Sequence, residues 1–159
     1  MKKTISIIIS IAMCAMLASC GGVKNEVSDT EQPTLIDTMS LEEKVGQILF
    51  VRCVDDEQTD DLMSIKPGGI LMFGRDFEGL TKDEVKEKIQ SYQDKSDIPL
   101  IIGADEEGGT VVRVSSNPNL APEKFKSPQE IYNEGGMDAV VENATEKSEL
   151  LLSLGVNMN

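Results

Sequence analysis

From residue 35 onward, two kinds of hydrophobic pattern alternate along the chain. Apolar residues recur at helical spacing over 41–48, whereas 48–51, 70–73 and 100–104 are short continuous apolar runs. A short continuous run is typical of a strand that is covered on both faces, as in a parallel sheet. The alternation therefore predicts an α/β fold in which helices connect parallel strands.

Two of the predicted helices are preceded by a start signal. Ser40 with Glu43, and Thr81 with Glu84, have the spacing of a capping box. In that motif the hydroxyl accepts an early helical N–H and the glutamate reaches back to the cap residue. We therefore expect helices to begin at both places, and the second helix to direct three apolar side chains inward: Val85, Ile89 and Tyr92.

The remaining segments are less regular. A helix is possible over 55–65, and a short turn is expected near Ser127, after a loop rich in Asn and Pro. A longer helix follows over about 137–153 and ends at Gly155, because glycine readily takes the left-handed conformation that ends helices. Residues 156–159 are expected to open a fourth strand.

Charged residues directly follow three of the predicted strands. Arg52 follows the first, Arg75 the second, and the acidic run that begins with Asp105 the third. The carboxyl ends of parallel strands are where α/β barrels and open α/β sheets bind ligands. Each arginine alone can equally be solvated or paired with a nearby acid, but three clusters at equivalent positions favour a shared site.

The acidic run 105–107 suggests sugar hydrolysis, which commonly uses two carboxyl groups. Adjacent side chains of an extended segment point in opposite directions, so we expect one carboxylate in the site and the others in salt bridges or at its mouth. Arg113 has two open roles. It can donate paired hydrogen bonds to a carboxylate or to vicinal hydroxyls, or it can lock the loop.

Composition removes several other classes of function. The 159 residues include 28 acidic and 15 basic side chains, a formal net charge of −13, which repels nucleic-acid phosphates. Histidine is absent, which excludes a histidine-based triad and most zinc sites within these residues. No nucleotide-binding or metal-binding motif occurs, so the sequence predicts no cofactor and no metal.

The first 19 residues have the pattern of a signal peptide. Two lysines precede an apolar run over 5–17, which is short for a membrane span, and 17–20 read Leu-Ala-Ser-Cys. This resembles the cleavage site of bacterial lipoproteins; an ordinary secretory signal or an uncleaved anchor are the alternatives. We therefore expect lipidation of Cys20, a flexible tether over 20–34 and a location at the outer face of the cell membrane.

Cysteine usage then leaves the folded part without a cross-link. Cys14 is removed with the signal and Cys20 carries lipid, so Cys53 is the single free thiol of the mature chain. No internal disulfide is expected, and the stability of the domain must come from its core.

Four segments in order, 39–47, 67–75, 105–113 and 154–159, resemble the N-terminal catalytic domain of glycoside hydrolase family 3. Within that family, residues 35–159 are most similar to bacterial β-N-acetylhexosaminidases. The resemblance implies a (β/α)8 TIM-type barrel and exo-acting hydrolysis with retention through a covalent glycosyl-aspartate. A barrel of this kind needs about 250 residues, so 35–159 would be its first half and the C-terminal half would be missing.

The resemblance also implies roles for single residues. Asp105 matches an aspartate that binds sugar hydroxyls, so Asp105, Arg113, Arg52 and Arg75 are our candidate substrate-binding residues. The general acid and the nucleophilic aspartate would lie on later segments, so no catalytic residue is assigned and this chain alone is expected to be inactive. Thr110 stands where many relatives have arginine or isoleucine, and contacts of that side chain are not transferred.

The parent enzyme would release terminal N-acetylglucosamine from cell-wall glycans. Two other classes of protein share some of these features. A lipid-anchored carbohydrate- or solute-binding protein would have the same leader and parallel α/β units without catalysis. A family member that has lost catalysis would serve as a binding module.

Overall fold

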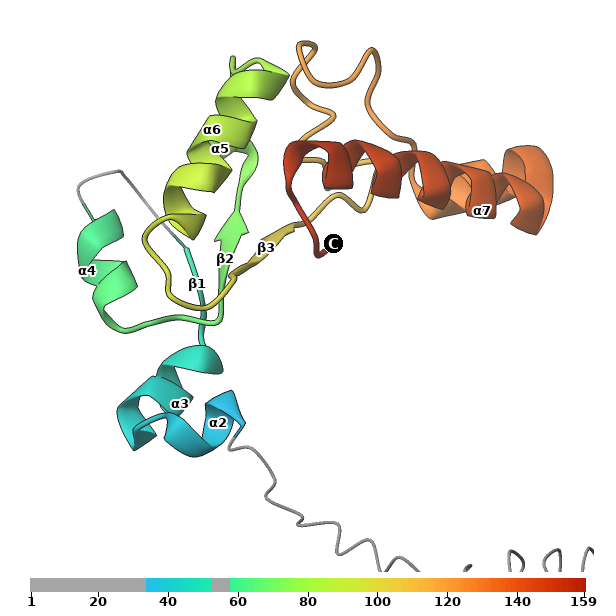
Figure 1. Ribbon diagram of the computed structural model, residues 1–159. Coiled ribbons are helices and arrows are strands. Elements are labelled where there is room, and N and C mark those ends of the chain that lie inside the picture. The colour runs from blue at the N-terminus through green and yellow to red at the C-terminus, as the bar shows by residue number, and fades with distance from the viewer. Residues whose placement is uncertain (1–33, 53–57) are drawn as a thin grey trace, which may run out of the picture. The chain divides into compact units, whose positions relative to one another are not determined.

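The computed structural model describes residues 34–52 and 58–159, drawn in colour in Figure 1. The predicted signal peptide, Cys20, the tether as far as residue 33 and Cys53 lie outside the described residues. Among the described helices, none combines the length and apolar character needed to cross a membrane.

A three-stranded parallel sheet forms the centre of the domain. Its strands are β1 (Phe50–Val51), β2 (Gly69–Met72) and β3 (Ile101–Ala104), arranged in the order β1-β2-β3. The helices are α2 (Leu35–Thr38) and α3 (Leu41–Gln47) before β1, α4 (Thr59–Ser64) between β1 and β2, α5 (Gly74–Phe77) and α6 (Lys82–Gln93) between β2 and β3, and α7 (Pro128–Leu154) after β3. The predicted α/β class with parallel strands is confirmed, whereas the described residues do not show a half barrel.

Both predicted capping boxes are present. The Glu43 N–H donates to Ser40 Oγ at 3.2 Å and the Ser40 N–H donates to Glu43 Oε2 at 2.9 Å. The second box is formed in the same way, with the Thr81 N–H donating to Glu84 Oε2 at 2.7 Å. The helices begin one residue after each cap, as expected, because the cap residue satisfies N–H groups that have no partner within the helix.

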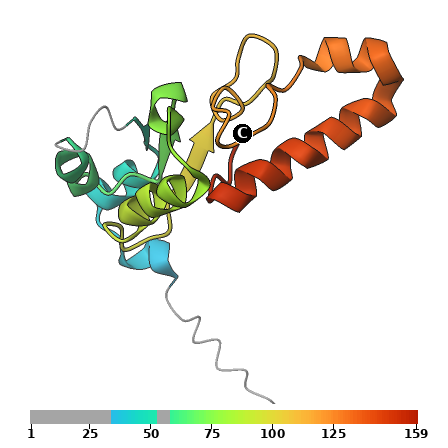
Figure 2. The same cartoon turned by 90° about the horizontal axis from the view of Figure 1, so that it is seen from above.

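Two predicted boundaries are corrected. The first strand is limited to Phe50–Val51, because the N–H groups of Ile48 and Leu49 donate to carbonyls at the end of α3 and are not available to the sheet. The turn expected near Ser127 is instead a third capping box that begins α7. The backbone of Gly136 is not helical, with a φ of 69°, so α7 is two helices joined at a kink. Figure 2 shows the chain turning back within α7.

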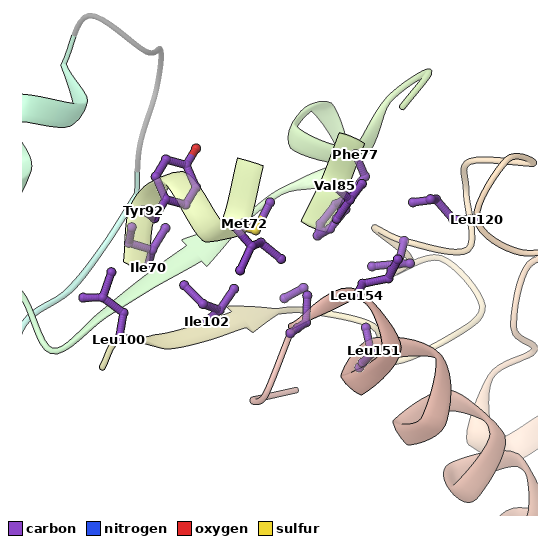
Figure 3. Close-up of a cluster of buried hydrophobic side chains, with 14 of the residues drawn as sticks. Ile70, Met72, Phe77, Val85, Tyr92, Leu100, Ile102, Leu120, Leu151 and Leu154 are labelled. Carbon is purple, nitrogen blue, oxygen red and sulfur yellow. The ribbon is translucent and has the colours of Figure 1, made fainter. Parts of the chain in front are cut away.

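The hydrophobic core lies between one face of the sheet and the helices α6 and α7 (Figure 3). Ile70, Met72, Ile102 and Ala104 supply the sheet side, and the three predicted residues of α6 are buried against it. The end of α7 adds Leu151 and Leu154. Burial of this apolar surface is the main source of stability for the fold.

The opposite face of the sheet is more open. Phe50 is 39% exposed and Ile101 48% exposed, although both are large apolar residues. The Phe50 ring lies across the face, since a Cβ placed on Gly103 would meet Phe50 Cζ at 2.6 Å. Residues 156–159 run alongside β3 and form one parallel bridge, Met158 with Gly103, where a fourth strand was expected to open.

Candidate functional site

The residues that directly follow the three strands lie at one edge of the sheet. Arg52 comes directly after β1, Phe73 after β2 and Asp105 after β3. The strands are parallel, so their carboxyl ends meet at the same edge. We define these three residues, together with Arg113 from the segment after β3, as the rim.

Arg113 and Asp105 meet at the rim. Arg113 Nη2 lies 3.6 Å from Asp105 Oδ2, and the two side chains are 27% and 47% exposed. A partly exposed pair of this kind contributes little to stability. The pair can nevertheless bind a polar ligand, because it places a carboxylate that accepts hydrogen bonds beside a guanidinium that donates them.

Phe73 connects the two arginines of the rim. The Arg52 guanidinium lies 4.0 Å from the centre of the Phe73 ring, and that of Arg113 lies 5.7 Å from it. Cations within about 6 Å of a ring centre are attracted by the ring quadrupole. Sequence reasoning missed Phe73 because it closes an apolar run and was assigned to the strand; its position directly before Gly74 and Arg75, in one of the family-like segments, was the available signal.

The structure brings together three of the four predicted substrate-binding residues. Arg75 is the exception: it is exposed on α5, and its side chain makes no hydrogen bond or ion pair with any part of the chain that the structure describes. A role for Arg75 in ligand binding stays a prediction.

Glu106 has a structural role that differs from that of its neighbours. It is fully buried, and its carboxylate accepts the N–H groups of Arg113 at 2.7 Å and Val114 at 2.6 Å. The N–H of Ser115 donates at 3.3 Å and its hydroxyl donates as well. This carboxylate therefore fixes the backbone of the segment that carries Arg113.

The three acids divide as an extended backbone requires. Glu106 points into the protein, Asp105 is in a salt bridge at the rim and Glu107 is exposed. Only Asp105 among them faces the arginines of the rim. Glu106 differs from the expectation, because its carboxylate is neither in a salt bridge nor at the mouth of the site but is bound to backbone N–H groups. A role for a single carboxylate of the run in ligand binding stays a prediction.

A buried lysine supports the same loop from α7. Lys147 is 7% exposed, its Nζ donates to the Glu107 carbonyl at 2.8 Å, and it lies 5.5 Å from the centre of the Phe125 ring. The pKa of Lys147 is lowered, because the effect of burial exceeds the opposite effect of the negative charges of Glu106 and Glu107. Sequence reasoning missed Lys147, although it precedes the buried Leu151 by one helical turn and so shares its face.

Asn159 holds the loop from a third direction. Its Oδ1 accepts the Glu106 N–H at 2.8 Å, and its Nδ2 donates to the Glu106 carbonyl at 3.2 Å. With α7 and the segment of Arg113, this amide completes the support around residues 105–107. The rim thus rests on a backbone that is hydrogen-bonded on several sides.

The rim has the hydrogen-bond donors and acceptors that a polyhydroxylated ligand requires. A carboxylate can accept hydrogen bonds from two adjacent hydroxyls, and guanidinium groups can donate to others. Within 34–52 and 58–159, no group of three or more His, Cys, Asp or Glu side chains is placed to hold a metal ion.

Comparison with known proteins adds an independent observation. Residues 40–159 match the sequence model of the glycosyl hydrolase family 3 N terminal domain. The matched range includes the whole sheet and every residue of the rim. A search of curated proteins finds no match to the chain.

Proposed function

The chain belongs to glycosyl hydrolase family 3, and from this membership we propose that it forms the N-terminal part of an exo-acting, retaining β-N-acetylhexosaminidase. The family itself supports a glycoside hydrolase. The finer assignment concerns the sugar: the substrate is terminal N-acetylglucosamine of cell-wall glycans. Its motivation is the similarity of the four segments within 39–159 to the hexosaminidase branch.

The Asp105–Arg113 pair is the observation that carries this proposal. It stands at the carboxyl ends of parallel strands in a domain of a sugar-hydrolysing family. Asp105 binds hydroxyls of the terminal sugar and Arg113 donates to a neighbouring oxygen. A hydrogen bond to a charged group contributes about 1.5–3 kcal/mol, enough to select a polyhydroxylated ring over water.

The proposal extends to the architecture and the location of the enzyme. Residues 35–159 are the first half of a (β/α)8 barrel, and the rest of the barrel covers the sheet face that bears Phe50 and Ile101. The exposure of these two apolar residues supports this arrangement. The lipoprotein-like segment 17–20 supports attachment through Cys20 to the outer face of the membrane.

The sugar preference is tested on the protein expressed from its complete reading frame. The purified enzyme is assayed with chromogenic β-linked N-acetylglucosamine, glucose and xylose under identical conditions. We expect the N-acetylglucosaminide to be cleaved with the highest kcat/KM. A preference for glucose or xylose contradicts the hexosaminidase assignment, and binding of the sugars without turnover favours a carbohydrate-binding role.

The role of Asp105 is tested in the same assay by Asp105→Asn. Loss of the carboxylate charge is expected to lower kcat/KM by about 10- to 100-fold for each charge-assisted hydrogen bond to the sugar. Glu107→Gln is the matched control, since it removes the same charge two residues away from an exposed side chain. Unchanged kinetics of Asp105→Asn would remove this residue from the site.

A further inference from the structure

The Phe73 ring has an unusual pair of neighbours for an aromatic residue at the end of a strand. It follows β2, the central strand, while Arg52 follows β1 and Arg113 lies beyond β3. The guanidinium groups of these two arginines, which come from the segments after the strands that flank β2, thus lie 4.0 and 5.7 Å from one ring centre. The attraction is strongest when the cation is partly shielded from water.

The backbone of Phe73 is held firmly. Its N–H donates to Asp76 Oδ2 at 2.7 Å, and its carbonyl accepts the Asp76 N–H at 2.8 Å. Asp76 is itself buried and lies 3.5 Å from Lys88 Nζ of α6. The backbone of Phe73 is therefore part of a turn that is connected to the core, and the position of this backbone does not depend on the arginines.

The guanidinium of Arg113 has few other constraints. Its backbone is fixed by Glu106, and its Cδ lies near Gly74, 4.0 Å from where a Cβ would stand. Its Nε is buried and has no hydrogen-bond partner among the residues that the structure describes. The interactions that place the charged end of Arg113 are thus the Phe73 ring and Asp105.

We propose that Phe73 is a positioning residue, which holds the Arg113 guanidinium beside Asp105 and thereby sets the affinity of the rim for its sugar. This inference rests on the proposed function, because it concerns the same site. Phe73 acts through Arg113: without the ring, the guanidinium is free to turn away from Asp105 and the paired donor and acceptor are lost.

The test uses the protein from the complete reading frame in four forms: wild type, Phe73→Leu, Phe73→Tyr and Phe77→Leu. Phe73→Leu is expected to raise KM by about 2- to 30-fold with kcat nearly unchanged, since uniform binding is what is lost. Phe73→Tyr keeps the ring and is expected to restore the wild-type KM. Phe77→Leu is the matched control, because this fully buried neighbour affects the melting temperature and not the rim.

A second readout reports on Arg113 directly. In protein labelled with ¹⁵N-arginine, the Nε–H signal of Arg113 is identified by its absence in Arg113→Lys. Asp105→Asn is expected to move this signal in the wild-type background and to leave it in place in the Phe73→Leu background, where the guanidinium no longer lies beside Asp105. The response to Asp105→Asn should persist in Phe77→Leu. Incorporation of fluorinated phenylalanines at 73 should raise KM stepwise, because fluorine weakens the negative face of the ring while preserving its shape.

The outcomes separate this inference from the proposed function. A response of the Arg113 signal to Asp105→Asn that is lost in Phe73→Leu, together with a raised KM, supports the positioning role. A response that persists in Phe73→Leu, or an unchanged KM, overturns it. If the wild-type protein neither cleaves nor binds any of the three sugars, the proposed function fails, and the response of the Arg113 signal still decides whether Phe73 places the guanidinium.

Discussion

Neighbouring acids of the run after β3 have opposite roles because they point to opposite sides of the backbone. Asp105 stays half exposed at the rim, whereas Glu106 is withdrawn from water and surrounded by backbone N–H groups. A buried carboxylate is costly unless donors replace its water, and the segment from Arg113 to Ser115 supplies them. The same backbone that satisfies Glu106 carries Arg113 to the rim.

Replacement of Glu106 by glutamine tests this structural role. The amide keeps one acceptor oxygen but places an NH₂ group among N–H donors, so we expect the free energy of unfolding to fall by about 2–4 kcal/mol. Denaturant unfolding of the complete protein measures the change. Glu107→Gln, on an exposed side chain, should stay within about 0.5 kcal/mol of wild type. Equal stability of the two variants would contradict the role assigned to Glu106.

We expect Lys147 to make the stability of the protein vary with pH in the alkaline range. Burial lowers its pKa in the folded state, so the folded protein releases this proton at a lower pH than the unfolded chain does. Stability should therefore rise as the pH increases from that lowered pKa toward the ordinary lysine value of about 10.4. Below the lowered pKa, Lys147 is protonated in both the folded and the unfolded state, so it does not change the free energy of unfolding with pH.

Urea unfolding between about pH 7 and 10.5 measures this dependence. The rise should be absent in Lys147→Met, which keeps the apolar stem and cannot titrate. Lys124→Met, at an exposed position, should preserve it. A wild-type profile that parallels the Lys147→Met profile throughout this range would show that Lys147 does not contribute.

At the scale of elements, glycines let the sheet accept the Phe50 ring across its open face. Gly69 and Gly103 lie under this ring, where an added Cβ would overlap ring atoms. At Gly103 the nearest atoms belong to side chains, whereas at Gly69 the Ile101 carbonyl oxygen is also only 2.5 Å away. The two glycines are thus required for different reasons.

A pair of double variants distinguishes these reasons. Gly103→Ala is expected to destabilise the protein by about 1–3 kcal/mol through overpacking, and Phe50→Leu in the same chain should recover most of the loss. Gly69→Ala should stay destabilised with or without Phe50→Leu, since backbone cannot move aside as a side chain does. Recovery of both alanine variants, or of neither, measured by thermal unfolding, would contradict this packing.

Element boundaries show where local signals are sufficient. The capping boxes at Ser40 and Thr81 place two helix starts correctly, because the motif is contained within four residues. The end of α3 and the length of β1 were misjudged, since an apolar run such as 48–51 fits a helix end and a strand equally well. Gly136 was not predicted as a kink, because glycine is compatible with both a helical and a positive φ and the sequence does not say which it takes.

For the molecule as a whole, the two faces of the sheet are unlike. One is covered by α6 and α7, and the other leaves Phe50 and Ile101 partly exposed. Large apolar patches that face water are uncommon on soluble monomers and usually mark a surface that is covered by something else. In the proposed enzyme, the remaining strands of the barrel close over this face, and the rim forms one part of the opening above it.

The sequence by itself determined the α/β class, the order of the main elements and three residues of the rim. These depend on patterns within a few residues: hydrophobic periodicity, capping motifs and charges placed directly after strands. Tertiary structure alone decided that Phe73 joins the rim, that Glu106 turns inward and that Lys147 supports the loop. Each of these facts depends on contacts between residues that are between 7 and 40 positions apart. Such contacts form only when the fold brings the segments together, and no hydrophobic period or capping motif encodes them.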